Sequence, residues 1–178
     1  MKKTICLPVM LILMSLVSYG QEKSNNLKIN ILSPIASTLN LQYEHVIKKD
    51  QSFQLGFFYT GYSNSGTKIS GFGITPEYRF YLSDDAAPKG VYVAPFLRYQ
   101  NYDLTDDLND KGTLSTFGGG LILGRQWVFK DKISLDLFIG PQYNSGSVSA
   151  SSGSSGNFSV GSVNGFGVRA GVCFGILF

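Results

Sequence analysis

Few residues in this sequence are of the types that commonly carry catalysis. His45 is the only histidine, and the two cysteines are Cys6 and Cys173. A histidine beside a serine could serve as the general base of a hydrolase acting on lipid. His45 lies in a run of alternating polar and apolar residues, close to a polar turn at Lys48, so we expect it at the rim of a strand. This position favours an interface histidine over a catalytic base, and we predict no catalytic residue.

Seven charged residues stand where polar and apolar residues alternate, each on the polar side of its segment. They carry four positive and three negative charges: Lys28, Glu44, Glu77, Arg79, Arg98, Asp136 and Arg169. Paired carboxylates among them could act as a general acid and base. Ion pairs between them could instead fill an interior, or the charges could line a narrow path for ions. The choice depends on the structure that brings them together.

The cysteine and glycine motifs add no further chemistry. Cys173 is the only cysteine outside the N-terminal apolar segment, which excludes an internal disulfide and a cysteine-based metal cluster. We expect it to be a small, inert, buried thiol. Gly118-Gly119-Gly120 and Gly165-Phe166-Gly167 have the glycine content of phosphate-binding loops, but no helix pattern follows either of them. We therefore predict no metal and no cofactor.

The stretch from Asn164 to Phe178 indicates which kind of element positions these residues. Its alternate residues from Phe166 to Phe178 are all apolar, whereas those between them are mostly glycine, with Arg169 as the one charge. A β-strand turns successive side chains to opposite faces. One face of this strand suits lipid and the other suits a crowded interior, as in the strands of outer-membrane barrels.

The same alternation recurs along the chain and defines eight expected strands. They cover residues 27–33, 38–47, 52–62, 69–82, 91–102, 113–129, 133–143 and 164–178. We therefore predict an all-β fold, an eight-stranded antiparallel up-and-down transmembrane β-barrel. A soluble calycin-type barrel is the alternative, in which the apolar faces would point inward to a ligand. The aromatic end at Phe178 and the polar residues of the other faces favour the transmembrane barrel.

The interior of an eight-stranded barrel is just wide enough for side chains to fill it. The seven charged residues would then form a lumen charge network that plugs the barrel, which we favour over a narrow ion path. Other residues fit the strands less well. Arg125 falls on an apolar face and would reach toward the membrane interface. Pro76 and Pro95, on neighbouring strands, predict a shared bulge or local kink.

The connections differ in length between the two sides of the expected barrel. Those after the second, fourth and sixth strands are short or compact, whereas longer ones include residues 103–112 and the Ser/Gly-rich tract 144–164. Short periplasmic turns and longer external loops are typical of such barrels. We expect the tract 144–164 to be a mobile, solvated loop. A contact surface for a host, a phage or another envelope protein is the alternative.

The first residues have the pattern of a secretory signal. Lys2 and Lys3 precede an apolar core at residues 5–17, which is too short to span a bilayer as a helix. We predict a signal peptide at residues 1–20, removed on export, and a barrel domain at residues 21–178; an uncleaved anchor is the alternative. Losing the two lysines lowers the net charge from +3 to +1, so nucleic acid is not an expected partner.

Several short motifs carry a resemblance to a known family. They are Lys28 to Pro34 (KINILSP), Gln42 to His45 (QYEH), Pro76 to Tyr81 (PEYRFY), Tyr92 to Phe96 (YVAPF) and the final Phe178. Across the chain after residue 20, the sequence resembles small eight-stranded outer-membrane barrels found in Bacteroidota, and more distantly the OmpA-type barrels. The resemblance implies this fold and an outer-membrane location. It implies no catalytic residue.

These observations favour a small outer-membrane barrel with a filled lumen and a structural or interaction role through its external loops. The alternatives are a porin-like narrow pore for ions or small solutes, and a lipid-modifying enzyme. We expect a monomer whose partners are outer-membrane lipid, the outer-membrane assembly machinery and an unknown protein at residues 144–164. The assembly signal would be formed by Phe174, Ile176 and Phe178.

Overall fold

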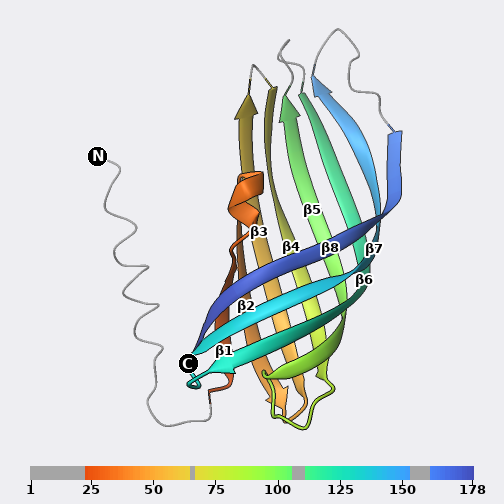
Figure 1. Cartoon of the computed structure of the whole chain (residues 1–178). Coiled ribbons are helices and arrows are strands. Elements are labelled where there is room, and N and C mark those ends of the chain that lie inside the picture. Colours follow the sequence, from red (N-terminus) through yellow and green to blue (C-terminus); the bar gives the residue numbers. More distant parts are fainter. Residues whose placement is uncertain (1–22, 65–66, 106–110, 153–160) are drawn as a thin grey trace, which may run out of the picture.

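A computed structural model describes residues 23–64, 67–105, 111–152 and 161–178. Eight strands follow one another along the chain: β1 (Asn25–Asn30), β2 (Thr38–Lys48), β3 (Gln51–Asn64), β4 (Thr67–Tyr81), β5 (Gly90–Thr105), β6 (Lys111–Phe129), β7 (Ile133–Ser152) and β8 (Gly161–Leu177). Each strand pairs antiparallel with the next, and β1 pairs with β8, which closes the barrel (Figure 1). The predicted eight-stranded antiparallel barrel is confirmed. Residues 1–20, assigned to a signal peptide, lie outside the described residues.

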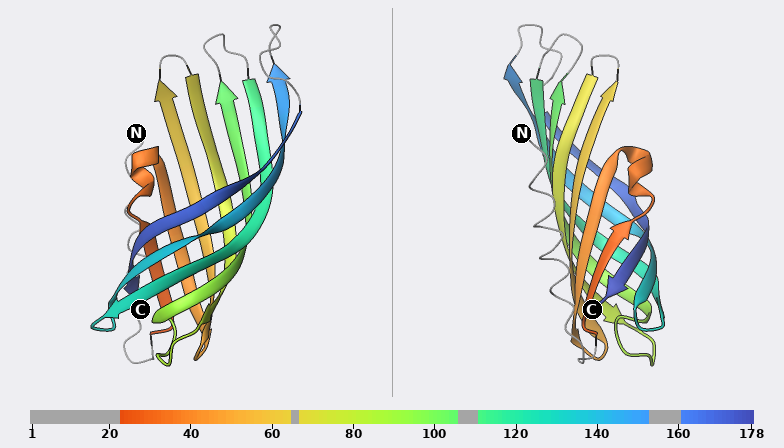
Figure 2. Two further views of the ribbon diagram at one scale, coloured as in Figure 1. Left: turned by 45° about the vertical axis from the view of Figure 1, so that its right-hand side comes forward. Right: turned by 90° about the vertical axis from the view of Figure 1, so that its left-hand side faces the viewer.

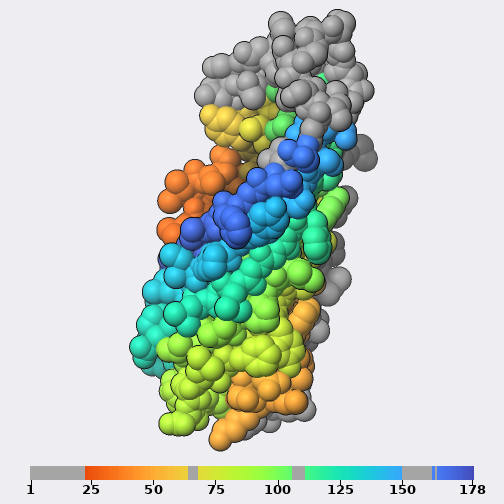
Figure 3. Space-filling view, turned by 90° about the vertical axis from the view of Figure 1, so that its right-hand side faces the viewer, coloured from red at the N-terminus to blue at the C-terminus, as the bar shows by residue number. Residues whose placement is uncertain are grey.

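Large apolar side chains cover the outside of the barrel, and polar ones fill much of the inside. All eight strands contribute exposed apolar residues, for example Phe57, 45% exposed on β3, and Phe174, 43% exposed on β8. Many of the residues that alternate with them are buried, and Gln54 and Arg79, for example, are fully so. The soluble calycin-type alternative is therefore wrong, because it requires the apolar faces to point inward. In Figure 3, β5 to β8 run as diagonal bands of closely packed atoms.

An apolar cluster occupies one side of the interior. It comprises Tyr81, Tyr92, Ala94, Phe96, Ile122, Phe138 and Cys173. The aromatic rings lie across glycines of the neighbouring strand, because a Cβ at Gly124 would collide with the Tyr92 ring and one at Gly171 with Phe138. Glycines on the inward faces of these strands thus leave the space that the aromatic rings occupy.

The two ends of the barrel differ. The connections β2–β3, β4–β5 and β6–β7, together with the start of β1 and the end of β8, lie at the lower end as drawn in Figure 1. The ends of β3, β5 and β7 and the starts of β4, β6 and β8 lie toward the upper end. Within the described residues, no helix has the length and apolar character needed to cross a lipid bilayer.

At the upper end of the barrel, β7 and β8 are longer than the sequence pattern predicted. β7 continues to Ser152 and pairs with β6 up to that residue, and β8 pairs with β7 from Gly161. Most of the tract 144–164, predicted to be a solvated loop, is therefore strand, and residues 153–160 lie outside the described part. The low-complexity composition was misleading, because paired neighbours on both sides satisfy the backbone of serine and glycine as well as that of any other residue.

The wall is lower at β1 and β2 than elsewhere. β1 ends at Asn30, and a 3₁₀ helix, η1 (Ser33–Ala36), returns the chain to β2 at mid-height, well below the upper ends of β3 to β7 (Figures 1 and 2). β8 pairs with β1 only from Cys173 to Leu177. One more hydrogen bond, donated by the Ile31 amide to the Val172 carbonyl over 2.9 Å, extends this contact.

Pro76 and Pro95 lie on the neighbouring strands β4 and β5, and the register places neither of them directly opposite the other. The pairs Ile74↔Tyr99 and Glu77↔Phe96 on β4 and β5 keep the same register on both sides of Pro76. No extra residue is inserted, so of the two expectations, a shared bulge or a local kink, the bulge is wrong. The strands accommodate the two missing amide donors within a regular register.

Candidate functional site

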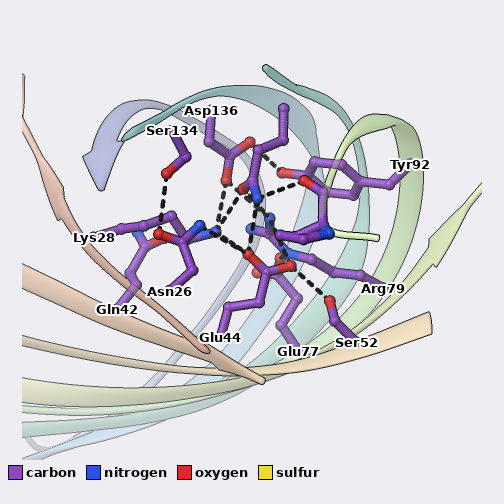
Figure 4. A network of polar contacts seen from close by, with 12 residues as sticks. Asn26, Lys28, Gln42, Glu44, Ser52, Glu77, Arg79, Tyr92, Ser134 and Asp136 are labelled. Carbon is purple, nitrogen blue, oxygen red and sulfur yellow. Dashed lines mark hydrogen bonds and ion pairs between the residues drawn. The ribbon is translucent and has the colours of Figure 1, made fainter. Parts of the chain in front are cut away.

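Polar side chains from all eight strands meet in the lower half of the barrel interior. They are Asn26 and Lys28 of β1, Glu44 of β2, Ser52 of β3, Glu77, Arg79 and Tyr81 of β4, Tyr92 of β5, Gln126 of β6, Ser134 and Asp136 of β7, and Arg169 of β8. We call this set the lumen network. Each member occupies the inward parity of its strand, so the alternation of the sequence places it there. Figure 4 shows most of these side chains pointing toward one another.

Lys28 joins three strands at one end of the lumen network. Its Nζ donates hydrogen bonds to Glu44 Oε2 at 2.8 Å, to Gln126 Oε1 at 2.9 Å and to Asp136 Oδ2 at 3.1 Å. All three donor sites of the ammonium group are thereby used. The Lys28, Glu44 and Asp136 side chains have no exposed surface.

Arg79 is the second centre of the lumen network (Figure 4). Its Nε donates to Glu77 Oε1 at 2.7 Å, and its Nη1 donates to Asp136 Oδ2 at 2.9 Å. The guanidinium carbon lies 4.2 Å from the centre of the Tyr92 ring, and the Tyr92 hydroxyl donates to Asp136 Oδ1 at 2.8 Å. Arg79 and Lys28 therefore share Asp136 as an anion.

Neutral side chains complete the coordination of Glu44. Its Oε1 accepts hydrogen bonds from the hydroxyls of Ser52 and Tyr81, both at 2.6 Å. Gln126 donates to Glu44 Oε2 at 3.1 Å and to the Pro88 carbonyl of the β4–β5 connection at 2.7 Å. Hydrogen bonds of this kind to a buried carboxylate stabilise its charged form. They also tie the lumen network to the lower end of the barrel.

Arg169 extends the lumen network upward. Its Nη1 donates to Glu77 Oε2 at 2.8 Å, and the guanidinium carbon lies 4.7 Å from the Phe96 ring centre and 4.8 Å from that of Phe138. Three cations, Lys28, Arg79 and Arg169, are thus matched by three carboxylates, Glu44, Glu77 and Asp136. Buried charges are tolerated when they are paired and hydrogen-bonded in this way.

Arg98 is the exception among the seven charges predicted to form one network. Within the described part of the chain, no carboxylate lies within ion-pair distance of it. Its guanidinium carbon stacks 4.8 Å from the centre of the Phe58 ring, and its buried Nε has no hydrogen-bond partner. Six of the seven predicted residues are therefore brought together, and the prediction that Arg98 joins the ion pairs is wrong. The alternation along each strand predicts which side chains face the interior, but it does not predict which charged groups come close enough to pair.

The neutral members of the lumen network were not singled out from the sequence. Ser52, Tyr81, Tyr92 and Gln126 all hydrogen-bond to Glu44 or Asp136. The sequence did contain a signal for them. Each lies on the same face of its strand as a predicted charged residue, or directly across from such a residue on the neighbouring strand. A search for polar residues on the inner faces, rather than for charges alone, would have found them.

The predicted candidates for covalent chemistry lie apart from one another. His45 is exposed on the outer face of β2, and its Nδ1 lies 2.9 Å from Asn25 Oδ1, which also accepts the Tyr43 hydroxyl at 2.7 Å. Cys173 is fully buried inside the barrel as a free thiol, as predicted. In the described ranges, no group of three His, Cys, Asp or Glu side chains could hold a metal ion.

Two further predictions concern the outer surface. Arg125 lies exposed on the outer face of β6 with its guanidinium carbon 5.1 Å from the Trp127 ring centre. Phe174 and Ile176, proposed as parts of the assembly signal with Phe178, point outward from β8 and are 43% and 60% exposed. Phe178 exchanges backbone hydrogen bonds with Asn25 at 2.9 and 3.2 Å, which pairs the two ends of the barrel chain.

Comparison with known proteins gives one family and one solved structure. Residues 6–151 match the family described as "Protein of unknown function (DUF3575)". The crystal structure of Ail, the attachment invasion locus protein of Yersinia pestis, is similar with a TM-score of 0.49 and 13% sequence identity, covering 89% of this chain and 100% of that one. At this level the likeness assigns neither a ligand nor a partner to the chain. No curated protein matches it significantly.

Proposed function

This chain belongs to the family described as "Protein of unknown function (DUF3575)", and we propose that it is a small outer-membrane barrel with a structural or interaction role. The observation that carries the proposal is the inverted distribution of side chains. Leu41, Leu55 and Phe174 are 39%, 43% and 43% exposed, whereas Lys28, Glu44 and Arg79 are at most 1% exposed. In water, an apolar surface of this extent would cause aggregation, but in a bilayer it faces lipid.

The closed barrel supports the same proposal. No hydrogen bond can be made to lipid, so a β-structure in a bilayer has to pair its strands with one another. Here every strand pairs on both sides over its lower part, from β1 with β2 to β8 with β1. The apolar outer faces of these paired segments would form the surface in contact with lipid.

The role itself is proposed to be structural or interactive, and not enzymatic. The lumen network uses its carboxylates in ion pairs and holds them at 0% side-chain exposure, which leaves none of them accessible to a substrate. His45 has Asn25 and not a serine as its hydrogen-bond neighbour. Both observations argue against a lipid-modifying enzyme.

The finer parts of the proposal rest on the sequence. Residues 1–20 would direct export as a signal peptide, and Phe174, Ile176 and Phe178 would be read by the outer-membrane assembly machinery. The protein would be a monomer, similar to the small barrels of Bacteroidota and more distantly to OmpA-type barrels. A partner protein would bind at the upper end, where β7 and β8 of the tract 144–164 extend beyond η1 (Figure 1).

Heat-modifiable migration tests the proposal directly. The protein would be extracted from cell envelopes with detergent and run on a denaturing gel with and without boiling. A barrel held by a buried lumen network should migrate faster unboiled than boiled, and the protein should fractionate with the outer membrane. Recovery of the folded protein from the water-soluble fraction, without detergent, would contradict the proposed location.

A further inference from the structure

Arg125 is a cation on the outer face of the barrel, which the proposed function assigns to lipid. It is exposed near the lower end of β6, and no carboxylate of the described residues lies within ion-pair distance of it. Its outward neighbours along β6 are Leu123 and Trp127, and the residues paired with it on β5 and β7 are Val91 and Leu137. A charged group among apolar side chains on a lipid-facing wall is unfavourable unless an anion or water meets it.

The Arg125 side chain leans toward the lower end of the barrel. Its guanidinium carbon lies 5.1 Å from the ring centre of Trp127, the next outward residue toward that end, and Phe129 follows with 51% exposure. Tryptophan gathers where a membrane meets water. A long basic side chain near this boundary places its charge among the lipid headgroups. Arg125 is therefore positioned to meet an anionic headgroup.

An apolar groove begins beside Arg125 on the outer surface. It has a volume of about 320 Å³, and its lining includes Leu123 of β6, Leu137 and Ile139 of β7, Ala170 and Val172 of β8, and Leu32 after β1. Leu123 and Leu137 both adjoin Arg125 on the outer face, so Arg125 borders one end of the groove. In Figures 1 and 3, β7 lies above β6 and β8 lies above β7. The groove therefore rises from Arg125 toward the middle of the barrel.

Two features of the strands leave this groove open. Ala170 has the smallest outward side chain of β8 between residues 166 and 176, so it fills little space beside β7. β1 ends at Asn30, and none of the described strands adjoins Ala170 on the side away from β7. The hollow is thus built into the paired strands themselves, because its position follows from a small residue and from the length of β1.

We propose that this surface holds a single glycerophospholipid, with its phosphate on Arg125 and one acyl chain in the groove. A guanidinium group presents parallel N–H donors that match two oxygens of a phosphate. The mostly aliphatic lining of the groove suits a hydrocarbon chain. Charge complementarity at Arg125 selects a lipid that carries phosphate over an uncharged one. The inference rests on the proposed membrane location and adds one particular lipid site to it.

Quenching of tryptophan fluorescence tests the proposal on the full chain folded in a nonionic detergent, because Trp127 is the single tryptophan and adjoins Arg125. The probes are phosphatidic acid and diacylglycerol with identical chains, brominated near the headgroup so that a bound lipid quenches the fluorescence. Phosphatidic acid should reach half-maximal quenching at a concentration about tenfold below that of diacylglycerol. Arg125→Leu should abolish this preference, and Arg125→Lys should retain part of it, because the charge remains.

Matched variants separate the site from the rest of the outer surface. Lys48→Met removes an exposed cation at the lower end of β2, outside the groove, and should keep the preference for phosphatidic acid. Ala170→Phe fills the groove and should weaken the binding of both lipids. Val168→Phe adds the same ring at the next outward position of β8, outside the groove lining, and should bind like the wild type.

The outcomes distinguish the lipid site from the membrane location on which it rests. Heat-modifiable migration verifies that each variant is a folded barrel. A folded wild type that does not distinguish the two lipids, or a folded Arg125→Leu that keeps the preference, would overturn the lipid site and leave the membrane location intact. Full competition by inorganic phosphate at the concentration of phosphatidic acid would also overturn it, because Arg125 would then take a free anion. Recovery of the folded wild type in water, without detergent, would contradict the location and with it the site.

Discussion

At the scale of single residues, the charges of the interior fall into two kinds that the sequence does not distinguish. Glu77 and Arg98 both stand on inward parity of neighbouring strands, yet Glu77 binds two arginines and Arg98 binds no carboxylate among the described residues. Breaking a buried pair is costly because the remaining charge keeps its desolvation penalty. Removing an unpaired charge leaves no such partner behind. The two residues should therefore respond to neutralisation in opposite ways.

Glu77→Gln should destabilise the barrel strongly. Glu77 accepts from Arg79 Nε at 2.7 Å and from Arg169 Nη1 at 2.8 Å, so the change leaves two buried guanidinium groups undercompensated. The expected loss in the free energy of unfolding is about 3–5 kcal/mol. Urea unfolding of the refolded protein, followed through the fluorescence of its single tryptophan, Trp127, measures it.

Arg98→Met serves as the opposite case in the same assay. Its guanidinium group stacks on Phe58 and pairs with no carboxylate of the described residues, so the free energy of unfolding should stay the same or rise. If Arg98→Met is as damaging as Glu77→Gln, then Arg98 has an anionic partner in the folded chain, and the division of the interior into a paired and an unpaired region is wrong.

At the scale of the strand, period-two alternation was sufficient to predict the number of strands and both of their faces. Leu137 and Asp136, for example, were assigned to opposite faces from the sequence, and they lie outside and inside the barrel. The strand ends were predictable only where polar turns or proline marked them. Ser145 to Ser149 gave no apolar alternation, because Val148 is the one apolar side chain in that part of β7 and the others are serine and glycine. The partners of each charge could not be predicted, because parity does not determine how far neighbouring strands are displaced along one another.

Leu137→Arg and Ser147→Arg test the outer face of β7. Both residues point outward from the same strand, but Leu137 lies among large apolar neighbours and Ser147 in the upper extension. An arginine at Leu137 should lower the free energy of unfolding by about 2–4 kcal/mol if the residue lies near the bilayer midplane. The loss should be smaller at Ser147, because the penalty falls toward the membrane interface. Unfolding in lipid vesicles measures both variants. Equal tolerance of the two arginines would contradict the assignment of the outer face to lipid.

The extension of β7 into the Ser/Gly tract is testable by amide hydrogen exchange. Residues 145–148 pair with β6 on one side and with β8 on the other, so their amides should exchange slowly. In β8, residues 165–169 pair with β7 and with no other described strand, so about every second amide there should exchange rapidly. Uniformly rapid exchange of the amides of residues 145–148 would contradict the paired strand and support the loop predicted from the sequence.

At the scale of the whole molecule, the barrel consists of two compartments. The lower one is crossed by the lumen network, whose charges balance and whose side chains come from all eight strands. The upper one has longer walls and a cavity of about 270 Å³ lined by Gln100, Thr116 and Phe166 among others, and none of the described strands pairs with the second edge of β8 between residues 161 and 171. This arrangement suits binding or display at one end, and it is unsuited to transport from one end to the other.

The lumen network should make the barrel non-conducting, which separates the proposed role from that of a pore. Lys28 and Arg79 each contact Asp136, and Lys28 also contacts Glu44, so these side chains cross-link β1, β2, β4 and β7 across the lower interior. An eight-stranded barrel leaves no water-filled channel beside side chains of this size. In planar bilayers, the wild type and Arg98→Met should both give currents at the background level. Steady, ion-selective channels in the wild type, with a selectivity that Arg98→Met shifts while the free energy of unfolding is unchanged, would mean that ions pass the lumen network and that the protein is a narrow pore.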